Sequence, residues 1–120
     1  MKITIKAPHH DLTDAMQDLI EEKFSALDKL VVHATSPVTL ECEVEESIAV
    51  ERAGAKYRAE GNLMVDGKLF RAEATNETLE GAVDRVRDDL ARELQNAQGK
   101  KHGLLKRGGA AIKRMLRFED

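Results

Sequence analysis

The alternation of apolar and polar residues divides the chain into strand-like and helix-like segments. Residues 2–6 alternate with a period of two, which is expected for a half-buried strand. Residues 13–31 place apolar side chains at helical spacing and predict an amphipathic helix, with Thr13 as its N-cap. The alternation returns over residues 38–44 and predicts a second strand.

The pair Asp66-Gly67 separates two further alternating runs, residues 57–65 and 68–74. Such a pair predicts a type I′ hairpin, because both central residues of that turn adopt positive φ. The turn sets the register of the two strands and places Gly61 opposite Ala72. We therefore expect a helix to approach the sheet closely over these two small residues.

The same register places Glu60 opposite Glu73 on the outer face of the sheet. Like charges directly opposite each other are unfavourable unless a neighbouring charge offsets them. Arg58 and Arg71 lie diagonally across the hairpin and are predicted to neutralise the two glutamates.

Residues 79–94 carry one apolar stripe at helical spacing and predict a second helix, capped by Thr75 or Asn76. The predicted order is βαβββα. It indicates the α+β class, a two-layer sandwich in which a four-stranded sheet carries both helices on one face. We expect one domain over residues 1–98 and a basic tail over residues 99–120.

Composition restricts the possible chemistry. The sequence has no glycine-rich phosphate loop, nucleophile motif or spaced set of metal ligands, so we expect no enzyme activity, no metal site and no cofactor. The adjacent pair His9-His10 is interpreted as a solvated turn. Cys42 occupies an inward strand position and is interpreted as a buried thiol. A single cysteine and the absence of a long apolar run predict a cytoplasmic chain without a membrane segment.

The net charge of −3 conceals a division along the sequence. Residues 1–98 carry 12 Lys and Arg against 20 Asp and Glu, whereas residues 99–120 carry 7 against 2. Affinity for polyanions comes chiefly from cations that displace condensed counterions. Composition therefore favours the tail, not the body, as an RNA-binding segment.

The block YRAEGNLMV-DG-KLFRAEA-TNET-LEGAVDRVRDDLAREL, together with KITIK, LTDAMQDLIEEKFSALDKL and VTLECEV, resembles the ribosome hibernation and ribosome-associated inhibitor family. The resemblance covers about residues 1–98 and implies the same βαβββα fold. It implies a non-catalytic protein that binds rRNA of the small ribosomal subunit and blocks the mRNA and tRNA sites. Ribosomal proteins are further partners that the resemblance allows. Away from the ribosome we expect a monomer.

Four body cations match basic positions in the two helices of that family and are expected to meet rRNA phosphates. They are Lys23, Lys29, Arg85 and Arg92. The alternative is pairing within one helix, because Arg85 precedes Asp89 by four residues and Arg92 follows Asp88 by four. Relatives tend to carry lysine where Asp89 stands.

The tail adds seven cations that alternate with apolar residues and complete the predicted rRNA-binding set. They are Lys100, Lys101, Lys106, Arg107, Lys113, Arg114 and Arg117. An extension that orders on rRNA is favoured. A helix on anionic lipid, a helix that binds a partner protein and a solubilising tail are the alternatives.

Two other functions compete with ribosome inhibition. Members of the family have also been described as modulators of an alternative sigma factor, and an acidic body suits a basic protein partner. General binding to double-stranded RNA is the third hypothesis, which the acidic body disfavours.

Overall fold

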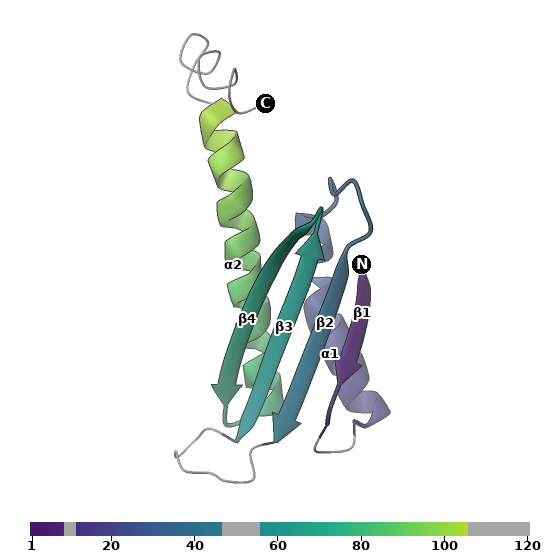
Figure 1. Cartoon of the computed structure of the whole chain (residues 1–120). Coiled ribbons are helices and arrows are strands. Elements are labelled where there is room, and N and C mark those ends of the chain that lie inside the picture. The colour runs from purple at the N-terminus through teal and green to yellow at the C-terminus, as the bar shows by residue number, and fades with distance from the viewer. Residues whose placement is uncertain (9–11, 47–55, 106–120) are drawn as a thin grey trace.

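The computed structural model of the chain describes residues 1–8, 12–46 and 56–105, with only the backbone described for 100–105 (Figure 1). The predicted order βαβββα is confirmed, with one short 3₁₀ turn, η1, added after the first helix. The elements are β1 (Lys2–Lys6), α1 (Asp14–Ser25), η1 (Asp28–Leu30), β2 (Thr39–Glu46), β3 (Tyr57–Val65), β4 (Lys68–Asn76) and α2 (Leu79–Leu105).

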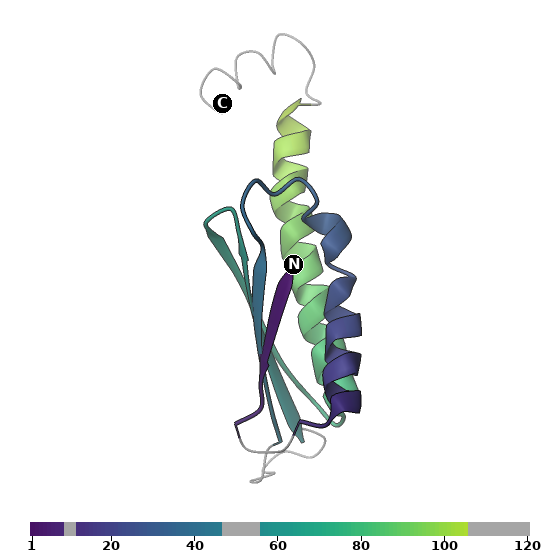
Figure 2. The same cartoon turned by 90° about the vertical axis from the view of Figure 1, so that its right-hand side faces the viewer.

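The four strands form one mixed sheet in the order β1-β2-β3-β4. Strand β1 pairs with β2 in parallel, and the other two pairings are antiparallel. Figure 2 shows both helices on one face of the sheet, which confirms the predicted two-layer sandwich. In the described part of the chain, the opposite face of the sheet carries no helix.

The β3–β4 hairpin has the predicted turn and register. Asp66 and Gly67 have φ of 49° and 82°, as a type I′ turn requires. Gly61 lies opposite Ala72. A Cβ atom on Gly61 would lie only 2.9 Å from Cγ1 of Val86, so α2 packs directly against the backbone of β3.

The core between the two layers is aliphatic. Its side chains come from one face of each helix and from the inward positions of the strands, and no charged or polar residue is buried among the described residues. The largest fully buried side chains are Phe24, Ile20, Leu27, Leu40, Leu63 and Leu90. Cys42 is also buried, as predicted. Burial raises the pKa of its thiol to about 12, so the side chain acts as a small apolar residue.

Of the two predicted helix caps, that of α1 is confirmed and that of α2 is not. Thr13 caps α1 as predicted, because its Oγ1 accepts a hydrogen bond from the N–H of Met16 at 3.1 Å. The predicted cap of α2 was wrong. Pairing with β3 continues to Asn76, so Thr75 and Asn76 belong to β4. Thr78 caps α2 instead and accepts from the N–H of Gly81 at 2.9 Å.

The last helix continues past residue 98, where the sequence placed the start of the tail. Helix α2 ends at Leu105, and Figure 1 shows its C-terminal turns extending beyond the sheet. Residues 106–120 lie outside the described part of the chain. The division into a body and a basic tail therefore stays a prediction.

Asp66 also connects the hairpin to the segment that leads into β2. Its Oδ1 accepts hydrogen bonds from the backbone N–H of Thr35 and of Ser36, both at 2.9 Å, and from their hydroxyl groups at 3.0 and 2.9 Å. These hydrogen bonds, chiefly those from Ser36, lower the pKa of the Asp66 carboxyl. The sequence predicted the turn at Asp66 but gave no signal for this long-range contact.

Candidate nucleic-acid interface

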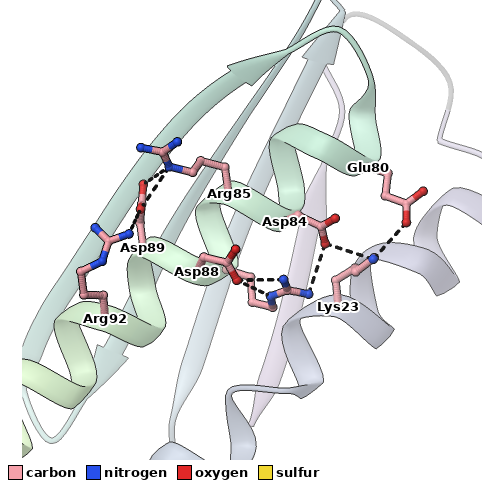
Figure 3. Close-up of polar contacts among 8 residues, drawn as sticks. Lys23, Glu80, Asp84, Arg85, Asp88, Asp89 and Arg92 are labelled. Carbon is pink, nitrogen blue, oxygen red and sulfur yellow. Dashed lines mark hydrogen bonds and ion pairs between the residues drawn. The ribbon is translucent and has the colours of Figure 1, made fainter.

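Lys23 lies on α1 but faces α2. Its Nζ lies 3.0 Å from Glu80 Oε2 and 3.0 Å from Asp84 Oδ1 (Figure 3). The side chain is only 22% exposed, so its aliphatic stem lies along the core while the ammonium reaches the carboxylates. Hydrogen bonds to Glu80 and Asp84 raise the pKa of Lys23. This cation therefore connects the two helices.

Arg87 completes the same cluster, although the sequence prediction did not include it. Its Nη1 lies 3.2 Å from Asp84 Oδ1, and its Nη2 lies 2.8 Å from Asp88 Oδ1. The Oδ1 atom of Asp84 is inaccessible to solvent, and Lys23 and Arg87 together offset its charge. The spacing of Asp84 and Arg87 by three residues was a visible signal for this ion pair.

Arg85 and Arg92 share one carboxylate, that of Asp89 (Figure 3). Arg85 Nε lies 3.3 Å from Asp89 Oδ1, as the spacing of four residues predicted. The predicted partner of Arg92 was wrong. Its Nη2 lies 3.0 Å from Asp89 Oδ1, whereas Asp88 pairs with Arg87. The two arginine side chains are 66% and 62% exposed, so their remaining N–H groups are accessible to a phosphate.

Lys29 differs from these three cations because it has no ion pair among the described residues. It lies in η1 and its side chain is exposed. The amide of Gln98 donates to the backbone carbonyl of Leu30 at 2.5 Å and thus holds η1 against α2. Lys29 is therefore a positioned, accessible cation at the C-terminal end of the helix layer.

The tail candidates lie at the end of the part of the chain that the structure describes, or beyond it. The backbone of Lys100 and Lys101 belongs to α2, whereas nothing is described of their side chains. The other five lie outside the described residues. They are Lys106, Arg107, Lys113, Arg114 and Arg117.

Up to residue 98, the helix layer carries an excess of negative charge. Residues 12–30 and 77–98 contain 11 Asp and Glu against 5 Lys and Arg. Lys23 and Arg87 are only 22% and 26% exposed, so the exposed cations among the side chains described in these two ranges are Lys29, Arg85 and Arg92. The layer offers few favourable contacts to a polyanion.

Two arginines on the open sheet face, Arg58 and Arg71, also form ion pairs within the chain. Arg58 contacts Glu43, Glu45, Glu60 and Glu73, and Arg71 contacts Glu60. This confirms the predicted neutralisation of the pair Glu60 and Glu73. Burial opposes the charge of Arg58, but the surrounding carboxylates, Glu73 above all, raise its pKa. These arginines stabilise the sheet.

No described helix is long and apolar enough to cross a membrane. Within residues 1–8, 12–46 and 56–105 there is likewise no group of three His, Cys, Asp or Glu residues that could hold a metal ion. His9 and His10 lie outside these ranges.

The fold and its surface define the class of protein first. It is a small α+β domain, and its candidate binding residues in the described part of the chain lie on α1, η1 and α2, on one side of the sheet. Residues 3–102 match the family described as "Sigma 54 modulation protein / S30EA ribosomal protein", and the chain belongs to that family.

Two curated relatives support this assignment. The chain is 33% identical over 94 residues to the ribosome hibernation promoting factor of Azotobacter vinelandii, over 78% of this chain and 79% of that protein. It is 30% identical over 104 residues to the ribosome hibernation promotion factor of Picosynechococcus, over 86% of this chain. The chain spans about half of that second relative, 52% of its length. The resemblance that the sequence predicted is thus confirmed.

Solved structures share the fold. The N-terminal domain of Protein Y from Thermus thermophilus has a TM-score of 0.67 and 25% identity, over 80% of this chain and 98% of that one. A ribosomal subunit interface protein from Coxiella burnetii has a TM-score of 0.64 and 16% identity, over 82% and 99%.

Proposed function

We propose that this protein is a non-catalytic ribosome hibernation factor that binds the small ribosomal subunit in the cytoplasm and inhibits translation by occupying the mRNA and tRNA sites. The observation that carries the proposal is the family match over residues 3–102, with relatives that are named hibernation factors. Neither the fold nor the described surface suggests a reaction, so the mechanism is occupancy.

The proposed contacts with rRNA divide between a small body set and the tail. In the body, Lys29 contacts phosphate directly, and Arg85 and Arg92 reach phosphate with the donors that Asp89 leaves free. Lys23 contributes indirectly, because it holds α1 against α2. The larger counterion-releasing set is the tail, from Lys100 to Arg117.

Co-sedimentation and competition test the proposal together. We expect about one protein bound per small subunit, and we expect bound protein to exclude initiator tRNA and mRNA from the same subunits. Protein that binds in this ratio without excluding either ligand would contradict the occupancy mechanism. A duplex RNA of unrelated sequence is the control, and equal affinity for it would favour general RNA binding.

The acidic helix layer favours a second candidate, a regulator that binds a basic protein surface, for which sigma factor modulation is an example. Retention on a protein partner after nuclease treatment, without binding to small subunits, would support this alternative.

A further inference from the structure

Strand β4 forms one edge of the sheet, as Figure 1 shows, and β3 is its only strand neighbour in the described part of the chain. In a two-residue hairpin the residues that flank the turn, here Val65 and Lys68, form a hydrogen-bonded pair. Every second residue of β4 therefore directs its backbone N–H and C=O toward the open edge. These residues are Leu69, Arg71, Glu73 and Thr75.

This edge is the longer of the two that the sheet presents. Strand β4 has nine residues, whereas β1 at the opposite edge has five. A long row of unpaired backbone groups is a template for an added strand. Charged side chains often protect such an edge against added strands. The pattern of charge along β4 therefore decides which strand can pair with it.

Helix α2 lies beneath the sheet but leaves hollows beside β4. One hollow of about 480 Å³ lies between Glu73–Thr75 and the helix residues Arg85 and Asp89. A second, of about 330 Å³, lies between Lys68–Phe70 and a segment of the helix that includes Glu93. Leu69 is 54% exposed here. Both the edge and its flank are thus accessible.

We propose that β4 of a second copy of this chain adds to the edge in antiparallel orientation, about a two-fold axis at Ala72. In this register Arg71 of each copy lies opposite Glu73 of the other, and all nine residues of β4 overlap. Residues 71 and 73 both direct backbone groups outward, so they form a hydrogen-bonded pair. The result is one continuous eight-stranded sheet.

Charge selects this register over its neighbours. A shift of the pairing by two residues in one direction places Arg71 opposite Arg71, and the same shift in the other direction places Glu73 opposite Glu73. Like charges directly opposite are destabilising, whereas opposite charges stabilise a cross-strand pair. A shift by one residue would place a residue whose backbone N–H and C=O point toward the open edge opposite a residue whose backbone groups point toward β3. The two residues could then form no hydrogen-bonded pair.

The hollows beside β4 meet in the same arrangement. The two-fold axis places Thr75 beside Leu69 of the second copy. The hollow that contains Arg85 and Asp89 therefore adjoins the hollow that contains Lys68 and Glu93 of the second copy, so each hollow carries charges of both signs. The sequence alone predicted a monomer; the open, self-complementary edge favours a dimer. Dimerisation of this kind does not depend on ribosome binding.

A charge-swap experiment on the full chain tests the register. Sedimentation velocity over a wide concentration range measures dimerisation of the native protein, of Arg71→Glu and of Glu73→Arg. Each variant alone places like charges opposite each other twice per dimer, so we expect its dissociation constant to rise about tenfold. Each variant also loses a contact within its own chain, either Arg71 with Glu60 or Glu73 with Arg58, so its folding is checked in parallel by thermal unfolding. An equimolar mixture of the two variants restores two opposite-charge pairs, and we expect a heterodimer of near-native affinity.

Recovery in the mixture separates an interface effect from loss of folding, since misfolded variants would not recover when mixed. Thr75→Pro is a second variant, because it removes an outward N–H without changing charge. Lys2→Glu is the charge-matched control on the same sheet face, in β1, and we expect native dimerisation. A native protein that stays monomeric up to millimolar concentration, or a mixture that does not recover, would overturn the proposal.

Discussion

The ammonium of Lys23 on α1 lies 3.0 Å from the Asp84 carboxylate on α2. A lysine that the sequence analysis assigned to rRNA therefore holds two helices of this chain together. The same holds in part for Arg85 and Arg92, which share Asp89. In the proposed function, attraction to RNA consequently comes from a few exposed cations of the helix layer and from the tail.

Lys23 and Lys29 should respond differently to the same substitution. We expect Lys23→Met to lower the midpoint of thermal unfolding, because Glu80 and Asp84 lose their partner, and to change affinity for small subunits by less than about twofold. Lys29→Met should leave the unfolding midpoint unchanged and reduce the salt dependence of binding by about one counterion. Calorimetry and co-sedimentation measure the two effects; a reversed pattern would show that Lys23 is the direct contact.

Removal of the Asp89 charge should strengthen binding to small subunits. Asp89→Asn frees the guanidinium groups of Arg85 and Arg92, and we expect a salt dependence steeper by up to about two counterions. Asp18→Asn is the matched control, because Asp18 is exposed on α1 and has no ion pair among the described residues. Equal gains in both variants would mean that only net charge matters.

Gly61 should not tolerate even a methyl group. The added Cβ would meet Val86 Cγ1 at 2.9 Å and Leu90 Cδ1 at 3.1 Å, so we expect Gly61→Ala to cost about 1–3 kcal/mol of unfolding free energy. Gly99→Ala is the control, because nothing lies within 4 Å of its Cβ position and alanine favours the helix. Urea unfolding compares the two; a neutral Gly61→Ala would contradict the close packing of α2 on β3.

The contacts of Asp66 predict an acid-sensitive contribution to stability. The pKa of its carboxyl is lowered in the folded state from an unfolded value of 3.8. The stabilisation is therefore fully present only well above pH 3.8 and is lost as pH falls through the folded value. We expect Asp66→Asn to lower stability at pH 7 and to reduce the dependence of stability on pH between 4 and 2, measured by urea unfolding. Glu41→Gln, on the open sheet face, is the control and should preserve that dependence.

Local signals in the sequence determined most of the fold. Asp66-Gly67 specifies its turn without help from the rest of the chain, and the turn then fixes the register from Val65 and Lys68 outward. The N-cap at Thr13 is likewise specified by neighbouring residues, because its hydroxyl accepts from the N–H of Met16. Thr78 was missed because β4 pairs with β3 as far as Asn76, and the extent of strand pairing depends on the partner strand.

The candidate site was less predictable, because ion pairs depend on which helices face each other. The periodicity of α1 placed Lys23 beside the core but could not indicate that Glu80 and Asp84 lie opposite. Arg92 pairs with Asp89 and Arg87 with Asp88, and residue spacing alone could not distinguish this distribution from the pairing of Arg92 with Asp88. Pairing within a helix is thus visible in sequence, whereas competition among pairs is not.

The salt dependence of binding to small ribosomal subunits tests the central claim most directly. The native chain is compared with a full-length variant in which Lys106, Arg107, Lys113, Arg114 and Arg117 are replaced by Gln. We predict stoichiometric binding by the native chain, and a variant that binds more weakly, with a salt dependence smaller by at least about two counterions. No binding of the native chain at low salt would contradict ribosome binding, and an unchanged salt dependence in the variant would contradict the role of the tail.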